Sequence, residues 1–255
     1  MKNNKLRIWL NVIIFLITFV VNFLATNLPL NGLTTGDISD TFDVYFVPAD
    51  YVFFIWFVIY LALIGFVIYQ ALPKQRDNTK LTAISPWFLV SNIANALWLV
   101  SFHYLRFMLS LVFMVILLIS LLVIFLKLNI GKSGASGAMK WLVELPFAIY
   151  LGWITVATIA NVTQVLFTLG WEGFGIAPQF WLVVMLAVAV IISALMSFTR
   201  HNLPYAAVLV WSFVGIAQKF PKVPLVNTAS LAATALVVVF LLAAFVRKKK
   251  AKEIK

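Results

Sequence analysis

The side chains that could do chemistry in this chain are aromatic rings and carboxamides, set at helical spacing within apolar runs. Asn95, Trp98 and Phe102 follow one another at intervals of three and four residues, with Asn92 one turn earlier. That spacing places them on one face of a helix. Two similar faces are Trp56 with Tyr60, and Tyr150, Trp153, Ala157 and Asn161. The first apolar run carries a polar face of Asn11, Thr18, Asn22 and Thr26.

These faces have two interpretations, and spacing alone does not choose between them. Lipid cannot satisfy a carboxamide, so such faces should point into a helix bundle. They can then hold helices together through hydrogen bonds, with small residues allowing close approach. They can also line an aromatic pocket in which a few polar groups orient a lipophilic ligand.

Other site chemistry is poorly represented. The chain has no cysteine and two histidines, so we expect no disulfide, thiolate chemistry or metal site. Glu144 is the one acid within an apolar run near its boundary, and no base or nucleophile accompanies it. We therefore expect a protein that is not an enzyme and has no cofactor.

The elements that must position these residues are eight apolar runs of roughly bilayer-spanning length. The chain of 255 residues is 64% hydrophobic and 11% charged, which excludes an ordinary soluble domain. Its net charge of +11 does not indicate nucleic-acid binding, because the basic residues lie in loops and tails. The sequence predicts an all-α, polytopic membrane helix bundle. The expected spans are 7–28, 51–72, 84–103, 107–127, 141–168, 179–199, 203–219 and 227–246.

Start signals support several of these boundaries. Asp50 precedes the second span, Ser85 and Pro86 open the third, Pro178 opens the sixth, and Asn227 opens the eighth.

The distribution of basic residues predicts the orientation. With the N-terminus inside, 16 of the 19 Lys and Arg residues fall on the inner side, and only Arg106, Lys219 and Lys222 fall outside. The positive-inside rule then places both termini in the cytoplasm, and we expect the plasma (inner) membrane of a bacterium. The longest connector, residues 29–50, faces outside and carries four acidic residues and no basic one. Its length suggests a lid or ordered cap.

Three segments resemble the tryptophan-rich sensory protein family, also called translocator proteins or peripheral benzodiazepine receptors. The first runs from Pro48 to Tyr60 and includes Trp56. The second is Asn95-Ala96-Leu97-Trp98 followed by Phe102, and the third is Pro146 with Trp153, Ala157 and Asn161. A single proline before the second span and a longer spacing from Pro146 to Trp153 depart from the usual family pattern.

The resemblance implies a five-helix translocator-like unit at 1–168, three additional transmembrane helices at 169–246 and a basic cytoplasmic tail at 247–255. It also implies a cavity between the five helices, capped by the loop between the first two. Family members bind bulky lipophilic molecules, including tetrapyrroles. The implied ligand-binding residues are Tyr51, Trp56, Tyr60, Asn95, Trp98, Tyr150, Trp153, Ala157 and Asn161.

The favoured function is therefore binding, and with it transport or sensing, of a lipophilic small molecule such as a tetrapyrrole or a lipid. The implied partners are that ligand, membrane lipid and a second copy in a homodimer, and not nucleic acid. Two alternatives stay open. A secondary solute transporter is disfavoured by the scarcity of intramembrane charge. A non-enzymatic membrane scaffold would use the polar faces for packing alone.

Overall fold

The computed structural model describes residues 2–28 and 30–253, and the regular elements in those ranges are helices. The long helices are α1 Lys2–Asn27, α3 Ile55–Ala71, α4 Thr79–His103, α5 Phe107–Lys127, α7 Leu145–Thr168, α8 Pro178–Arg200, α9 Leu203–Lys219 and α10 Pro224–Glu253. The short ones are α2 Thr35–Asp40 and α6 Gly137–Met139. A 3-10 helix, Asp50–Phe54, leads into α3, and a π-helical turn, Lys140–Glu144, leads into α7.

The expected all-α membrane bundle is confirmed. Seven helices of the described ranges are long and apolar enough to cross a membrane. The remaining expected span is α9, an apolar helix of 17 residues, which rises about 25 Å and lies at the lower limit for a spanning helix.

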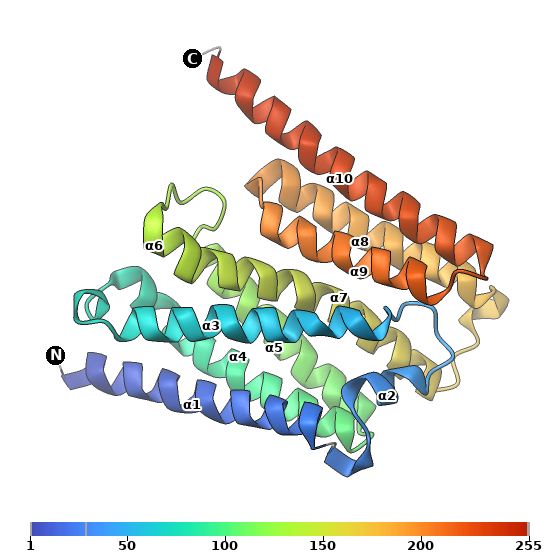
Figure 1. The fold of residues 1–255 in the computed structure, drawn as a ribbon, viewed down its shortest axis with the longest axis horizontal. Coiled ribbons are helices and arrows are strands. Elements are labelled where there is room, and N and C mark those ends of the chain that lie inside the picture. The colour runs from blue at the N-terminus through green and yellow to red at the C-terminus, as the bar shows by residue number, and fades with distance from the viewer. Residues whose placement is uncertain (1, 29, 254–255) are drawn as a thin grey trace.

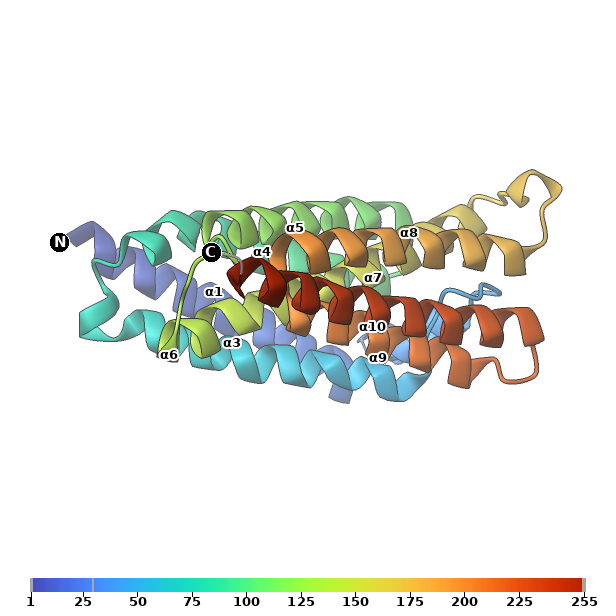
Figure 2. The same ribbon diagram turned by 90° about the horizontal axis from the view of Figure 1, so that it is seen from above.

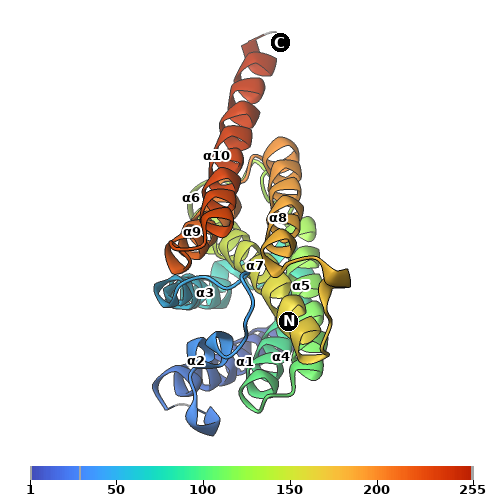
Figure 3. The same cartoon turned by 90° about the vertical axis from the view of Figure 1, so that its right-hand side faces the viewer.

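The helices pack side by side along one direction (Figure 1). Helix α7 lies centrally and packs against α5, α9 and α3. Helices α8, α9 and α10 pack on one another and flank the first five, as the end view in Figure 3 shows. The N-terminus, the C-terminus and the α8–α9 turn share one end of the bundle, and the α1–α3 connection lies at the other (Figures 1 and 2).

The predicted starts of α4 and α10 were wrong. Helix α4 begins at Thr79, where the Asn78 side chain accepts hydrogen bonds from the amides of Lys80 and Leu81. Pro86 therefore lies inside α4 instead of opening it. The last helix begins at Pro224, three residues before the expected start. The side-chain amide of Asn227 does not cap this helix and donates to the Ala217 carbonyl of α9.

The basic segment after Val246 is also helical as far as Glu253, because α10 continues past the expected end of its span. At about 45 Å, α10 is longer than the hydrocarbon core is thick, so its basic end extends past the apolar part.

Candidate functional site

A buried hydrogen-bond network centred on Asn95 joins four helices. The Asn95 Oδ1 atom accepts from Asn22 Nδ2 of α1 at 2.8 Å and from the Tyr60 hydroxyl of α3 at 3.2 Å. Its Nδ2 atom donates to the Tyr150 hydroxyl of α7 at 2.8 Å. Asn95 is fully buried, so losing this side chain would remove a hydrogen-bond partner of the Tyr60 and Tyr150 hydroxyls in an apolar interior.

Beside this network lies an aromatic cluster arranged around Trp56. The Trp56 ring stacks on Tyr60 at 5.9 Å and on Trp98 at 5.7 Å between ring centroids. It meets Tyr150 and Trp153 edge-on, at 6.1 Å and 6.0 Å. These separations and angles are the ones that aromatic pairs favour. The cluster therefore brings together the predicted faces of α3, α4 and α7.

A cavity of about 680 Å³ opens on the α1 side of Trp56, between α1, α3 and the segment that caps them. Its apolar wall comes from both helices, and its polar rim comes from the start of α2 and from Asp50. The lining residues are Phe19, Asn22, Phe23, Thr34, Thr35, Gly36, Asp37, Asp50, Tyr51, Phe53, Phe54, Trp56, Phe57, Tyr60, Leu61, Ile64 and Leu99.

The predicted site residues fall into three groups around this cavity. Tyr51, Trp56 and Tyr60 line it. Asn95, Trp98, Tyr150 and Trp153 are buried behind Trp56 and Tyr60, in contact with them.

Ala157 and Asn161 do not belong to the cavity lining. The Asn161 amide instead exchanges hydrogen bonds with the Ser110 hydroxyl of α5 at 3.3–3.4 Å. The predicted face of α7 is thus divided between the aromatic cluster and a helix–helix contact.

Two buried indole groups of the aromatic cluster are unsatisfied. The Nε1 atoms of Trp98 and Trp153 have no hydrogen-bond partner among the described residues. The two side chains are 5% and 3% exposed. An unpaired buried donor carries a cost in free energy, and neither indole lines the cavity.

The polar face of α1 serves mainly to hold α1 against its neighbours. Asn11 Nδ2 donates to Gln70 at 3.0 Å and to Ser85 at 2.8 Å, and the Thr18 hydroxyl donates to the Asn92 carbonyl. Asn22 alone of this face also lines the cavity. The side chain of Thr26, the last member of the predicted face, lies outside the described residues.

The α1–α3 connection covers the end of the bundle and is tied to α4. His103 is fully buried at the end of α4. Its ring nitrogens lie 3.0 Å from the Thr35 hydroxyl and 3.2 Å from the Leu30 carbonyl. Neither contact was predictable from the local pattern, because it joins residues about 70 positions apart.

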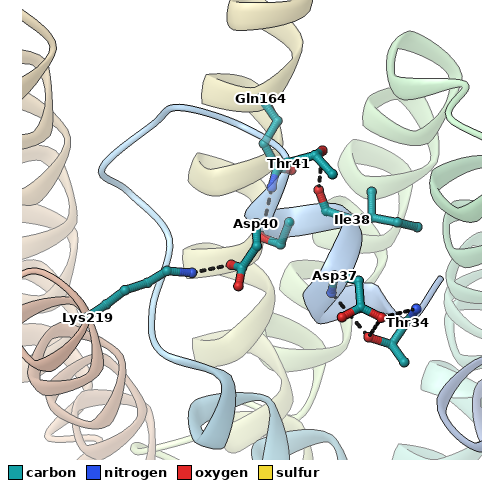
Figure 4. A network of polar contacts seen from close by, with 8 residues as sticks. Thr34, Asp37, Ile38, Asp40, Thr41, Gln164 and Lys219 are labelled. Atoms are coloured by element: carbon teal, nitrogen blue, oxygen red, sulfur yellow. Dashed lines mark hydrogen bonds and ion pairs between the residues drawn. The ribbon is translucent and has the colours of Figure 1, made fainter.

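Helix α2 lies within this connection and forms part of the cavity rim. Thr34 and Asp37 form a reciprocal capping box at its N-terminus (Figure 4). Hydrogen bonds from the Thr34 hydroxyl and amide lower the pKa of the Asp37 carboxyl, so it is ionised near neutral pH. The Gln164 amide of α7 donates to Ser39 at 3.1 Å and ties α2 to the bundle. Gln164 could not be singled out in the sequence, because a single amide near the end of a span has no distinctive pattern.

A second apolar groove of about 530 Å³ lies between α8 and α10. Val190, Ala194 and Phe240 are among its lining residues, which are all apolar. It lacks the tryptophan, the tyrosines and the polar rim of the first cavity, and the α1–α3 cavity is therefore the candidate binding site.

The sequence matches a known protein family over most of its length. A family model described as TSPO-like protein matches residues 8–245, a range that includes α8, α9 and most of α10 as well as the first five long helices. No curated protein and no solved structure matches the chain.

Proposed function

The chain belongs to the TSPO-like protein family, and from this premise we propose that it binds a lipophilic small molecule in the α1–α3 cavity. The observation that carries the proposal is Trp56, which lines the cavity and also packs on Tyr60, Trp98 and Trp153. A ligand that touches Trp56 therefore meets a ring held in place from behind.

The ligand class that we propose is flat and apolar, with a tetrapyrrole as the model compound and a membrane lipid as the second candidate. The cavity volume of about 680 Å³ lies in the range of small-molecule sites. Aromatic side chains stack favourably on flat rings.

We propose that the protein binds this ligand without catalysing a reaction, and that binding serves transport or sensing. A secondary ion-coupled transporter is the second candidate. Such transporters usually place ionisable side chains within the membrane, and the candidate cavity has carboxylates only at its rim, from Asp37 and Asp50. Its apolar wall favours a lipophilic ligand over a coupled polar solute.

The proposed setting is the bacterial plasma membrane, with both termini in the cytoplasm and the cavity rim facing outside. The integral membrane location follows from the seven apolar helices and the family. The orientation rests on the distribution of basic residues, 16 inside and three outside. Membrane lipid and a second copy of the chain complete the proposed partners.

A porphyrin titration tests the proposal. The purified chain in detergent is titrated with protoporphyrin, and quenching of the fluorescence of its nine tryptophans is followed. Saturable quenching that is weakened by Trp56→Phe and retained in Asn161→Ala is the expected result. Quenching that does not saturate, or that both variants lose equally, would refute a site at Trp56.

A further inference from the structure

One face of α9 contacts the segment that leads into the cavity. Trp211, Gly215 and Lys219 are spaced by four residues and so lie on one side of α9. We call these three residues the anchoring face. The segment that they contact consists of residues 40–52, between α2 and α3. Figure 3 shows α3 with α1 on one side and α9 on the other.

The middle of this contact is a close approach of two backbones at Gly215. The Ala49 amide donates to the Gly215 carbonyl at 3.2 Å. A Cβ atom at position 215 would lie 2.2 Å from Val52 Cγ2 and 3.2 Å from Pro48 Cβ. A Cβ atom cannot lie 2.2 Å from a methyl carbon, so any larger residue at position 215 would force Val52 to move.

The two ends of the anchoring face contribute a ring contact and an ion pair. Trp211 Nε1 donates to the Val52 carbonyl at 3.2 Å, and its ring meets Tyr51 edge-on at 5.1 Å. Lys219 forms an ion pair with Asp40 at the end of α2 (Figure 4).

Contacts beside the anchoring face also hold residues 40–52 against the C-terminal helices. The Tyr45 ring packs edge-on against Phe220 at 5.1 Å, and its hydroxyl accepts from Gln179 of α8 at 3.2 Å. Phe46 and Val47 are buried, each 1% exposed. Residues 40–52 are thus held against α8 and α9 at several points along the segment.

The fixed segment is the one that supplies part of the cavity. Asp50 and Tyr51 line the cavity directly, and Phe53 and Phe54 follow within the same 3-10 helix. On the other side of the segment, Thr35, Gly36 and Asp37 of α2 form the rim. The half of the rim formed by Asp50 and Tyr51 therefore depends on where residues 40–52 are held, and the α2 half adjoins the same segment.

We propose that the anchoring face of α9 is a positioning surface for the ligand cavity, so that ligand affinity depends on the C-terminal helices α8, α9 and α10. This inference rests on the proposed function for its ligand, whereas the anchoring itself can be measured without one. It gives a role to residues 169–246, the three helices proposed as additional to the five-helix unit.

A cysteine reporter at Val47 measures the anchoring. The chain contains no cysteine, so Val47→Cys introduces a single thiol of similar size at a buried position of the segment. The rate at which maleimide labels this thiol, in the full chain in detergent, reports how often residues 40–52 move away from α9. Lys219→Gln should raise that rate roughly two- to fivefold, the effect expected from losing a partly exposed ion pair. Gly215→Val should raise it about tenfold or more, because the side chain displaces Val52.

Matched control variants distinguish a specific loss of anchoring from a general destabilisation of the helix bundle. Lys222→Gln removes an exposed charge three residues from Lys219 and should leave the labelling rate unchanged. Lys219→Arg should behave as the parent does, and the exchanged pair Lys219→Asp with Asp40→Lys should restore slow labelling. Thermal unfolding of each variant checks that the bundle is intact, and Lys219→Gln keeps the test valid even where Gly215→Val fails to fold.

Protoporphyrin affinity, measured by tryptophan quenching on the same variants without the reporter, completes the test. We expect Lys219→Gln and Gly215→Val to weaken binding in the order of their labelling rates, and Lys222→Gln and Lys219→Arg to bind as the wild type does. Unchanged labelling in Lys219→Gln and Gly215→Val would overturn the anchoring. Faster labelling with unchanged porphyrin affinity would overturn the positioning role. If the wild type binds no porphyrin, the proposed function fails, and the labelling rates alone still decide the anchoring.

Discussion

At the scale of single residues, Trp56 connects the cavity to the buried aromatic cluster. Its type and its spacing from Tyr60 were evident in the sequence, and the structure places both residues on the cavity wall. The role of Asn161 was not evident, because helical spacing fixes the face of a residue and not the neighbour that this face meets. Asn161 lies two turns beyond Trp153 and faces Ser110 of α5 instead of the cavity.

Replacing Trp56 should therefore weaken ligand binding more than any other aromatic substitution. For Trp56→Ala we expect a loss of roughly 1–3 kcal/mol in porphyrin binding, the range for a buried aromatic contact. Trp153→Ala should cost less, since Trp153 reaches the cavity through Trp56 and Phe53. Fluorescence titration measures both, and an equal loss in Asn161→Ala would contradict the assignment.

Replacing Asn95, unlike replacing Trp56, should mainly lower the stability of the fold. Asn95→Ala leaves the Tyr60 and Tyr150 hydroxyls and the Asn22 amide without their shared partner. We expect the variant to be destabilised by about 1–3 kcal/mol. Thermal unfolding in detergent checks this, and an unfolding temperature equal to that of the wild type would mean that the network adds little.

At the scale of elements, the long apolar helices were predictable because about 20 apolar residues in succession specify a spanning helix. The start of α4 was missed, since Pro86 gives a strong start signal while Asn78 lies in a polar stretch with several candidate caps. The cavity lies between α1 and α3, closed by α2, and α2 was not predicted. Six residues with a capping box inside a long connector give too short a signal for periodicity.

The capping box of α2 should matter to the rim. Thr34→Ala removes the hydroxyl that accepts from the Asp37 amide, so hydrogen exchange at residues 35–40 should quicken by roughly fivefold. Exchange measured by mass spectrometry checks this, with Thr82→Ala, an exposed threonine of α4, as the control. Identical exchange in the wild type and Thr34→Ala would show that packing alone holds α2.

The same box predicts a lack of pH dependence near neutrality. The folded-state pKa of Asp37 lies below its ordinary value of 3.8. The capping box therefore contributes its full stabilisation above pH 3.8, and that stabilisation is lost as the pH falls through the lowered pKa. Porphyrin affinity should therefore not change between about pH 7 and pH 5 on account of Asp37. A fall in affinity over that interval that Asp37→Asn abolishes would contradict this prediction.

At the scale of the whole molecule, the distribution of charge predicts the orientation in the membrane. A cysteine at Asp43, an exposed residue of the α1–α3 connection, should react with an impermeant maleimide added outside intact cells. A cysteine at Lys80, exposed at the start of α4, should react only after the membrane is opened. The reverse pattern would show that the termini face outside.

The association of the C-terminal helices with the cap was beyond prediction from sequence. Lys219 of α9 and Asp40 of α2 are 179 positions apart, and an ion pair between residues so distant in the sequence leaves no periodic pattern. Gly215 could not be singled out either, because only its distance to Val52 shows why a glycine is needed. Local spacing thus predicts the helices and their inward faces, and long-range packing decides which of those faces enclose the cavity.

The most direct test of the central claim is porphyrin protection of single cysteines placed in the two grooves. Ile64→Cys lies on the wall of the α1–α3 cavity, and Ala194→Cys lies in the apolar groove between α8 and α10. Both positions are partly exposed, so maleimide can reach each of them in detergent. If the α1–α3 cavity is the binding site, protoporphyrin slows labelling at position 64 and leaves position 194 unaffected. Equal protection at both positions, or none at position 64, would contradict the account.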